Sequence, residues 1–375
     1  MGYGNAAMED LVTSSVLREE VRRLSSQFWR GRRVLVTGHN GFKGAWLVLM
    51  LSSLGAKVIG FALPCEDGAS GYEALGSADH MALEHIGDVR EKGRLEAAFR
   101  MSCPEIVIHL AAQAFVGRGH KDPVGTFTTN VGGTVNLLDA VRLWGLDVIS
   151  VVIVTSDKVY RNDGTGRPFR ENDPLGGTDP YSASKAASEF AVGSFSSSFG
   201  RAFPATASAR AGNVVGGGDF GEDRLIPDLV RAEQAGRPLT VRHPEATRPF
   251  QHVLDVLIGY LLLAEDLALK PEQTPRALNF GPAELEMSVS EVLKTIARIR
   301  NRPVLWEAAN PAAAIFSDAP RLAIDSSLAR ETLRWAPRLV GDAVFTETLN
   351  WYEAWLQGES MHLPSQSAVC RALAV

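Results

Sequence analysis

The sequence has few cysteines, no long apolar run and no excess of basic residues. Its three cysteines (Cys65, Cys103 and Cys370) are an odd number without CxxC spacing, which argues against a disulfide framework or a zinc site. The eight histidines show no HExxH-type spacing, so we predict no metal. No apolar stretch reaches the roughly 18 residues that a membrane helix needs. The N-terminus carries acidic residues and lacks the apolar core of a secretory signal, so we expect a cytoplasmic protein.

The charge balance argues against a polyanionic partner. A formal net charge of −5 and a pI near 6.0 favour neither nucleic acid nor an anionic membrane surface. The 375 residues, 45% hydrophobic and 22% charged, have the composition of an ordinary globular protein. This length is enough for one large α/β domain or two smaller ones.

Apolar strand patterns alternate with helical patterns along most of the chain. Continuous apolar strands of this kind predict a parallel, doubly wound α/β sheet with right-handed crossovers. We expect strands at 32–38, 57–63, 84–89, 105–112, 147–156, 205–215 and 276–282, and helices at 44–55, 129–145 and 181–200, with a surface helix at 8–27.

The first strand runs into a glycine-rich turn, "VTGHNGFKGAW", which places Gly38, Gly41 and Gly44 in GxxGxxG spacing. Glycines allow a tight turn and a close approach of backbone N–H groups to a pyrophosphate at a helix N-terminus. A ligand-free glycine connection is the alternative, but the position after the first strand of a βαβ series favours dinucleotide binding. This is the spacing of the extended short-chain dehydrogenases/reductases.

The end of the second strand bears on the choice between NAD and NADP. An acid there usually binds the ribose hydroxyls of NAD, whereas a nearby arginine suits the 2′-phosphate of NADP. Here the strand ends "FALPCED", in which Glu66 and Asp67 come a few residues late and no arginine is close. We therefore expect NAD.

These features predict a domain order. An N-terminal extension (1–27) precedes a Rossmann domain (28–215), whose sheet is completed by later segments. A smaller substrate-binding lobe (216–357) follows, and the tail (358–375) lacks periodicity, so we expect it to be loosely held.

Tyr181 and Lys185 in "DPYSASKAASE" lie four residues apart, one turn apart on a helix. An ammonium near the phenol would lower the pKa of Tyr181 toward neutrality and allow it to accept a proton. A solvated Tyr and Lys on a helix surface is the alternative. The glycine turn upstream favours the catalytic interpretation.

The stretch "VVIVTSDKVY" (151–160) is a buried strand that leads directly into Ser156, Asp157 and Lys158. Charges beside a sheet core are costly unless they are paired or used. A salt bridge or a solvated loop is possible, but ligands bind at the carboxyl ends of strands in open α/β sheets.

The chain from Phe28 to about Met361 resembles the CDP-glucose 4,6-dehydratases, a branch of the NAD-dependent extended short-chain dehydrogenases/reductases. Lysine stands after the aspartate in that branch, whereas related dehydratases have Glu and epimerases have "TSS". Two departures are a longer extension before "FW" and Val159 where the branch has Cys. The resemblance is carried by "FWRGRRVLVTGHNGFKGAWL", "HIGDVR", "PEIVIHLAAQ", "TNVGGTVNLLDAV", "TSDK", "YSASKAASE", "RAGNVVGGGDF", "DRLIPDLVRA", "RPFQHVLDVLIGYLLLAE" and "ALNFGP".

The resemblance implies a separate role in the reaction for each of five residues. Tyr181 takes the proton of the C4 hydroxyl while hydride leaves for NAD, Ser156 hydrogen-bonds the C4 oxygen, and Lys185 holds the nicotinamide ribose. Asp157 protonates the leaving C6 hydroxyl. Lys158 removes the C5 proton, which requires a neutral amine, or, if charged, stabilises the developing enolate.

The resemblance also implies binding residues and partners. His109 is expected to be structural. The substrate is CDP-glucose, and the chain is expected to form a homodimer or dimer of dimers through 124–144 and 181–199. The cofactor contacts are Gly38, Gly41, Phe42, Gly44, Asp88, Val89, Leu110, Ala111, Ala112, Thr155, Tyr181 and Lys185, and the substrate contacts are Gln113, Asn213, Arg224 and Arg248.

Three alternatives remain open from the residues. The same fold carries dTDP-glucose and GDP-mannose 4,6-dehydratases and sugar-nucleotide 4-epimerases. It also carries non-enzymatic NAD-binding proteins, although these typically lose the Tyr or the Lys that this chain retains.

Overall fold

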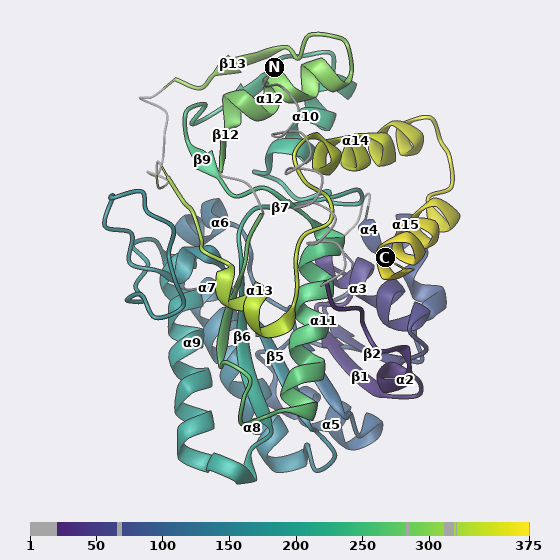
Figure 1. Cartoon of the computed structure of the whole chain (residues 1–375), viewed down its shortest axis with the longest axis vertical. Helices are drawn as coiled ribbons and strands as arrows, with labels where there is room; N and C mark the ends of the chain where they lie inside the picture. The colour runs from purple at the N-terminus through teal and green to yellow at the C-terminus, as the bar shows by residue number, and fades with distance from the viewer. Residues whose placement is uncertain (1–20, 66–69, 283–285, 311–318, 320, 375) are drawn as a thin grey trace, which may run out of the picture.

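A seven-stranded parallel sheet organises the computed structural model, which describes residues 21–65, 70–282, 286–310, 319 and 321–374 (Figure 1). The strand order is β11-β6-β5-β4-β1-β2-β3, and every neighbouring pair is parallel. The order reverses between β1 and β4, which is the usual binding point of a doubly wound fold. The strands are β1 (Arg33–Thr37), β2 (Lys57–Ala62), β3 (Leu83–Ile86), β4 (Ile106–His109), β5 (Ser150–Val154), β6 (Ala205–Ala211) and β11 (Ala277–Phe280).

The central strands are apolar on both faces because helices cover both. Along β5, Val151 and Ile153 pack into one core while Val152 and Val154 pack into the other. The side chains of a strand alternate between faces, so an uninterrupted apolar run is what a doubly covered strand requires.

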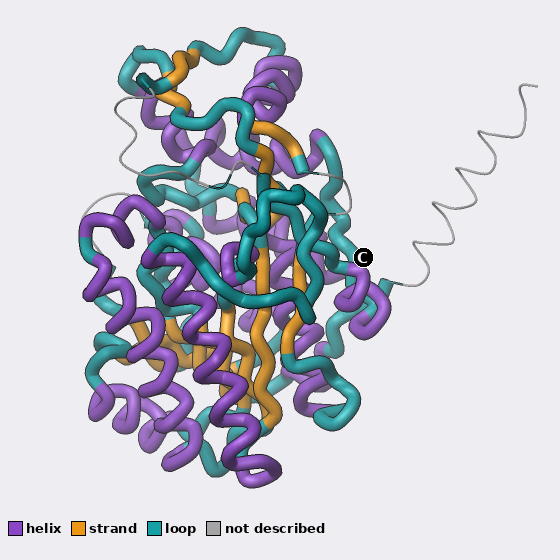
Figure 2. The backbone as a smooth tube through the Cα atoms, turned by 90° about the vertical axis from the view of Figure 1, so that its left-hand side faces the viewer, coloured by secondary structure: helices purple, strands orange, loops and turns teal. Residues whose placement is uncertain are grey.

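Two helical layers enclose the sheet, as Figure 2 shows with strands in orange between helices in purple. The helices of the first layer are α5 (Lys92–Ser102), α8 (Gly133–Trp144) and α9 (Pro180–Phe199), and those of the second are α3 (Phe42–Ser53), α11 (Val253–Leu269) and α15 (His362–Ala374).

A smaller set of elements gathers at one end of the sheet, where Figure 1 shows α10, α12 and α14. Three short strand pairs, β7–β10, β8–β13 and β9–β12, belong to this region. Its elements are β7 (Val214–Val215), α10 (Leu225–Gln234), β8 (Leu239–Val241), β9 (Thr247–Arg248), β10 (Gln251–His252), β12 (Met287–Ser288), α12 (Val289–Ile299), β13 (Trp306–Ala308) and α14 (Asp342–Leu356). The remaining helices are α2 (Ser26–Trp29), α4 (Gly71–Ala74), α6 (Val116–Lys121), α7 (Pro123–Phe127) and α13 (Ser327–Leu333).

The predicted parallel, doubly wound sheet is confirmed, with shorter strands than expected. The strand expected over 205–215 stops at Ala211 and resumes as β7, because Gly212 and Asn213 turn the chain toward the smaller lobe. The domain boundaries stay a prediction. Beyond residue 216, β11 joins the sheet and α11 packs on it.

The prediction for the C-terminal tail is wrong. Residues 362–374 form α15, which packs on α3 and α11 and buries Val369 completely. Ser365 in the same helix accepts a hydrogen bond of 3.0 Å from the Trp351 indole. The apolar positions Val369, Ala372 and Leu373 lie at helical spacing, but small and polar residues between them mask the pattern.

The predicted helix at 8–27 lies mostly outside the described residues. Residues 21–25 are not helical, and α2 begins at Ser26. Glu265 of α11 holds this segment, since its carboxylate accepts hydrogen bonds from Ser25 N (2.8 Å) and Trp29 Nε1 (2.7 Å).

Candidate active site

A cavity of about 700 Å³ lies at the carboxyl ends of the central strands, between the sheet and the smaller lobe. It brings the glycine turn, the end of β5 and the start of α9 together with Asn213, Arg224 and Arg248. Every residue that the sequence predicted as a cofactor contact lines it: Gly38, Gly41, Phe42, Gly44, Asp88, Val89, Leu110, Ala111, Ala112, Thr155, Tyr181 and Lys185.

The turn after β1 folds tightly against the neighbouring backbone because its glycines have no side chains. Gly38 adopts φ +71°, and a Cβ there would lie 2.8 Å from Ala111 N. A Cβ on Gly44 would lie 2.1 Å from the Gly38 carbonyl oxygen. No side chain caps the start of α3, so its first N–H groups are left for an anion. This cradle fits the pyrophosphate of a dinucleotide.

Beside the cradle, Asp88 and His109 are held in fixed states. Asp88 accepts bonds from Arg90 Nε (2.9 Å) and Arg90 N (2.8 Å), and the hydrogen bonds to Arg90 lower the pKa of its carboxyl. His109 lies between Thr37 and Thr134, and burial lowers its pKa to about 3. A neutral, buried, hydrogen-bonded imidazole is a structural group.

Helix α9 places Tyr181 and Lys185 in the cavity. Asp179 caps the helix by accepting a 3.0 Å bond from Ser182 N, and Pro180 occupies the first turn. Lys185 Nζ donates to the Val154 carbonyl at 3.1 Å, and burial lowers its pKa to about 8 against the attraction of Glu189. The lysine is thereby fixed to the end of β5.

The expected lowering of the Tyr181 pKa by Lys185 is not found. Burial raises the pKa of Tyr181 to about 12, and the charge of Asp157 adds to this rise. A hydrogen bond with Ser156 and the charge of Arg224 oppose it. The physical reason is that the phenol is buried close to a carboxylate, which disfavours a second negative charge.

Ser156, Asp157 and Lys158 form a tight turn directly after β5. Ser156 Oγ accepts a 3.2 Å bond from Lys158 N and donates a 3.1 Å bond to Asp157 Oδ1. Asp157 Oδ2 is buried and has no hydrogen-bond partner among the described residues. Lys158 lines the same cavity. The turn therefore places a buried acid, one oxygen of which has no hydrogen-bond partner among the described residues, beside an amine.

Burial raises the pKa of Asp157 to about 6. The positive charge of Lys158, the Ser156 hydrogen bond and the charges of Arg248 and Lys43 all work against the rise. A carboxyl with a pKa near 6 can hold and release a proton close to neutral pH, as a general acid must.

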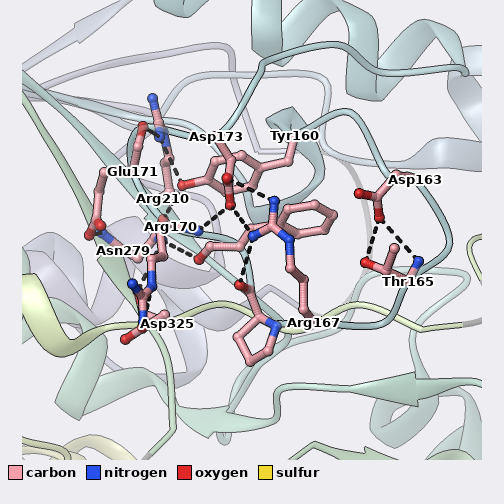
Figure 3. Close-up of polar contacts among 12 residues, drawn as sticks. Tyr160, Asp163, Thr165, Arg167, Arg170, Glu171, Asp173, Arg210, Asn279 and Asp325 are labelled. Carbon is pink, nitrogen blue, oxygen red and sulfur yellow. Dashed lines mark hydrogen bonds and ion pairs between the residues drawn. The ribbon is translucent and has the colours of Figure 1, made fainter.

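A polar network flanks the turn, and Figure 3 shows the part of it around Tyr160, Arg210 and Asn279. The Tyr160 hydroxyl donates to Asn279 Oδ1 at 2.6 Å and accepts from Arg210 Nη1 at 2.8 Å. Arg210 also forms a two-point ion pair with Glu189 of α9, with Nε–Oε1 at 2.8 Å and Nη2–Oε2 at 2.6 Å. Glu189 Oε1 accepts a further 2.6 Å bond from Thr155. The network ties both ends of the turn to the helix that carries Tyr181.

Three of the four predicted substrate contacts, Asn213, Arg224 and Arg248, line the cavity. Arg224 lies at the cavity over the ring of Phe115 (5.0 Å to the centroid) and pairs with both Asp219 oxygens at 2.8 and 2.9 Å.

Gln113 does not line the cavity. Its Nε2 donates to Thr126 (2.9 Å) and its Oε1 accepts from Phe115 N (2.6 Å). These hydrogen bonds give Gln113 a role in folding the 113–126 segment, and its contact with a substrate stays a prediction.

Sequence reasoning missed Lys43, Asp219 and Tyr260. Lys43 lines the cavity with its Nζ 5.8 Å from the Tyr260 ring centroid, and Asp219 pairs with Arg224. Lys43 lies in the first turn of α3, where its positive charge is unfavourable next to the helix dipole. This unfavourable position is visible in the sequence and could have marked Lys43 as a candidate.

Two negative findings apply to the described part of the chain. It contains no group of three or more His, Cys, Asp or Glu side chains arranged to hold a metal ion. It also contains no helix with the length and apolarity to cross a membrane.

Comparison with known proteins places this architecture among nucleotide-sugar enzymes. The family described as GDP-mannose 4,6 dehydratase matches residues 35–348. The CDP-glucose 4,6-dehydratase of Salmonella typhimurium is 38% identical over 361 residues, which cover 92% of this chain and 97% of that protein. A dTDP-glucose 4,6-dehydratase of Xanthomonas campestris pv. campestris is 30% identical, covering 86% of this chain and 95% of that protein.

A solved structure gives the same fold. The UDP-glucose 4-epimerase of Thermus thermophilus, in complex with NAD, superposes with a TM-score of 0.73 at 26% identity. The match covers 86% of this chain and 99% of the epimerase.

Proposed function

Because the chain belongs to the GDP-mannose 4,6 dehydratase family, we propose that it is an NAD-dependent CDP-glucose 4,6-dehydratase. It converts CDP-D-glucose to CDP-4-keto-6-deoxy-D-glucose and water. The observation that carries the proposal is the Asp157–Lys158 pair, which shares one cavity with Tyr181 and Lys185. The 38% identity with the Salmonella CDP-glucose 4,6-dehydratase supports the choice of substrate.

NAD is the cofactor that the cradle accommodates. The turn at Gly38 and Gly41 and the N-terminus of α3 would hold its pyrophosphate, Asp88 its adenosine half, and Lys185 its nicotinamide ribose. When bound, NAD accepts hydride from C4 of the sugar and returns it to C6.

At C4, the chain's own residues handle the hydroxyl proton. Tyr181 takes this proton as the ketone forms, and Ser156 hydrogen-bonds the C4 oxygen. The pKa of Tyr181 is about 12 in the free protein. This pKa must fall when cofactor and substrate fill the site, so that the phenol can take the proton. Protonation of Asp157 removes one of the charges that hold the pKa of Tyr181 high.

At C5 and C6, an acid and a base remove water. The C4 ketone acidifies the C5 proton, which Lys158 takes, while Asp157 Oδ2 gives its proton to the C6 hydroxyl. The C6–O bond breaks, water leaves and a C5–C6 double bond forms. The proton on Lys158 then returns to C5 as hydride reduces C6. Tyr181 releases the proton that it took at C4, and Asp157 takes up one proton from solvent, so protons and electrons balance and the site is restored.

On the nucleotide side, Arg224 and Arg248 would bind the diphosphate, since both line the cavity and guanidinium groups bind phosphate oxygens through two donors. Arg224 is already oriented by Asp219 and Phe115. The preference for cytosine rests on the named relative.

The function is tested by incubating the NAD-loaded protein with CDP-glucose and following the absorbance of a 4-keto sugar in alkali. We expect turnover with CDP-glucose and little with dTDP-glucose, UDP-glucose or GDP-mannose. Turnover of one of these and none of CDP-glucose would overturn the substrate assignment. Formation of a C4 epimer without loss of water would overturn the reaction type.

The role of Lys158 is tested separately with Lys158→Met. If Lys158 is the base, this variant still oxidises C4, seen as NADH absorbance, but no longer exchanges the C5 proton with solvent deuterium. Exchange at the wild-type rate would refute the assignment and leave Lys158 with an electrostatic role toward the enolate.

We also propose a cytoplasmic homodimer formed through the 124–144 and 181–199 segments. Apolar side chains are exposed on this face, with Val124 73% and Phe190 65% exposed. Light scattering after size exclusion should give twice the chain mass, and Phe190→Asp should reduce it. A monomeric wild type contradicts this proposal.

A further inference from the structure

Lys43 lies in the cavity but has no role in the reaction as proposed above. It lies in the first turn of α3, immediately after the glycine turn, and lines the same cavity as Asp157 and Asp219. Its Nζ lies over the ring of Tyr260 of α11, 5.8 Å from the centroid. The distance is within the range of a weak cation–π contact.

The position is unfavourable for a positive charge. The N-terminus of a helix carries partial positive charge, and Lys43 is half-buried there. Burial lowers the pKa of Lys43 to about 7, and the charges of Arg224 and Lys185 contribute to the fall. Asp157 and Asp219 act in the opposite direction. Both oxygens of Asp219 are already bound by Arg224, whereas Asp157 Oδ2 is buried without a hydrogen-bond partner in the described part of the chain.

The charged and titratable groups around this pair come from several elements. The attraction between Lys43 and Asp157 is mutual, since each charge shifts the pKa of the other group toward its ionised form. The groups that face Asp157 are Lys158 on its own turn, Arg248 on β9, Tyr181 on α9, Tyr260 on α11 and Lys43 on α3. The groups that face Lys43 are Lys185 on α9, Arg224 before α10, Asp219 after β7 and Asp157.

We propose that Lys43 is a positioning residue whose charge acts through Asp157 and sets the pH range in which this carboxyl carries the proton that it delivers to the C6 hydroxyl. The inference rests on the proposed function. It assigns Lys43 no contact with the reacting atoms.

The sign of the effect follows from the charges. Asp157 must be protonated to act as an acid, so kcat falls as the pH rises through its pKa. Removing the charge of Lys43 removes a force that lowers this pKa, so the alkaline limb of the kcat profile moves to higher pH. Arginine keeps the charge, so Lys43→Arg leaves the limb where the wild type has it.

The test is the pH dependence of kcat for CDP-glucose at saturating NAD and substrate. We expect Lys43→Met to move the alkaline limb up by about one pH unit, the lower end of what a neighbouring opposite charge does to a carboxyl. Lys43→Arg should retain the wild-type limb. Lys57→Met, which removes an exposed lysine at the opposite end of the sheet, is the matched control and should also retain it.

Two outcomes overturn the inference. One is a Lys43→Met limb that coincides with the wild type. The other is an equal shift in Lys43→Met and Lys43→Arg, which would indicate lost packing and not lost charge. A wild type that does not dehydrate CDP-glucose at all would refute the proposed function instead, so the two failures are distinguishable.

A second readout does not depend on turnover. Difference infrared spectroscopy of the NAD-loaded protein can follow the protonated-carboxyl C=O band of Asp157, assigned by its loss in Asp157→Asn. Its titration midpoint should rise in Lys43→Met and stay in Lys43→Arg. An unchanged midpoint in Lys43→Met overturns the inference even if that variant is too slow to assay.

Discussion

The buried ion pair between Arg210 and Glu189 offers a quantitative test of how the site is held. Their side chains are 4% and 5% exposed, and the pair joins β6 to the catalytic helix α9. Arg210→Met removes both contacts to Glu189 and the 2.8 Å bond to Tyr160, and leaves the carboxylate buried. Breaking a buried pair from one side costs about 3–5 kcal/mol, so we expect a loss of this size in the free energy of unfolding.

The assay is urea unfolding followed by circular dichroism, with refolding verified. The double variant Arg210→Met/Glu189→Leu should recover much of the loss, because no charge is then left buried without a partner. The control is Arg298→Met, which breaks an exposed two-point pair with Asp342 and should leave the unfolding midpoint unchanged. A loss below about 1 kcal/mol in Arg210→Met, or a double variant less stable than that single one, would refute the reasoning.

Three further predictions address the reaction, its pH dependence and the C-terminal helix. Tyr181→Phe should lower kcat roughly 100- to 10,000-fold with an unchanged unfolding midpoint, and steady-state assays with CDP-glucose that show wild-type turnover would contradict its role. The pKa of Asp157 is raised to about 6 from 3.8, so its contribution to stability is full at low pH and is lost as the pH rises through 6. Asp157→Asn should therefore stabilise the fold by up to about 3 kcal/mol at pH 8 but not at pH 4, and it should lower kcat. Urea unfolding measures the stability at both pH values, and equal effects would contradict the raised pKa of Asp157. Val369→Asp should destabilise the protein by about 3 kcal/mol because it buries a charge. Leu363→Asp is the control: its side chain is 73% exposed, so thermal unfolding should not change. Equal unfolding midpoints for the two variants would show that α15 does not pack as described.

The sequence predicted the sheet because its signals are local. β-Branched apolar runs such as "VVIV" and the glycine turn after β1 need no tertiary information, and both lie where they were expected. The same is true of Ser156, Asp157 and Lys158, since a charged pair directly after a buried strand stands out in any sequence.

What the sequence missed depends on packing between distant segments. Lys43 is 114 residues from Asp157 in the chain, and they meet because the start of α3 and the end of β5 face one cavity. The raised pKa of Tyr181 follows from burial, which spacing does not report. The local hydrogen bonds of Gln113 with Thr126 and Phe115 are likewise a result of packing that its position in the sequence does not report.

The most direct test of the central claim is the fate of the C4 hydrogen. The protein is incubated with CDP-glucose that carries deuterium at C4, and the product is examined by proton NMR and mass spectrometry. A 4,6-dehydratase gives a product that has lost water, with a ketone at C4 and the deuterium in the C6 methyl group. Deuterium still at C4 in a sugar that retains its C6 hydroxyl would contradict the account.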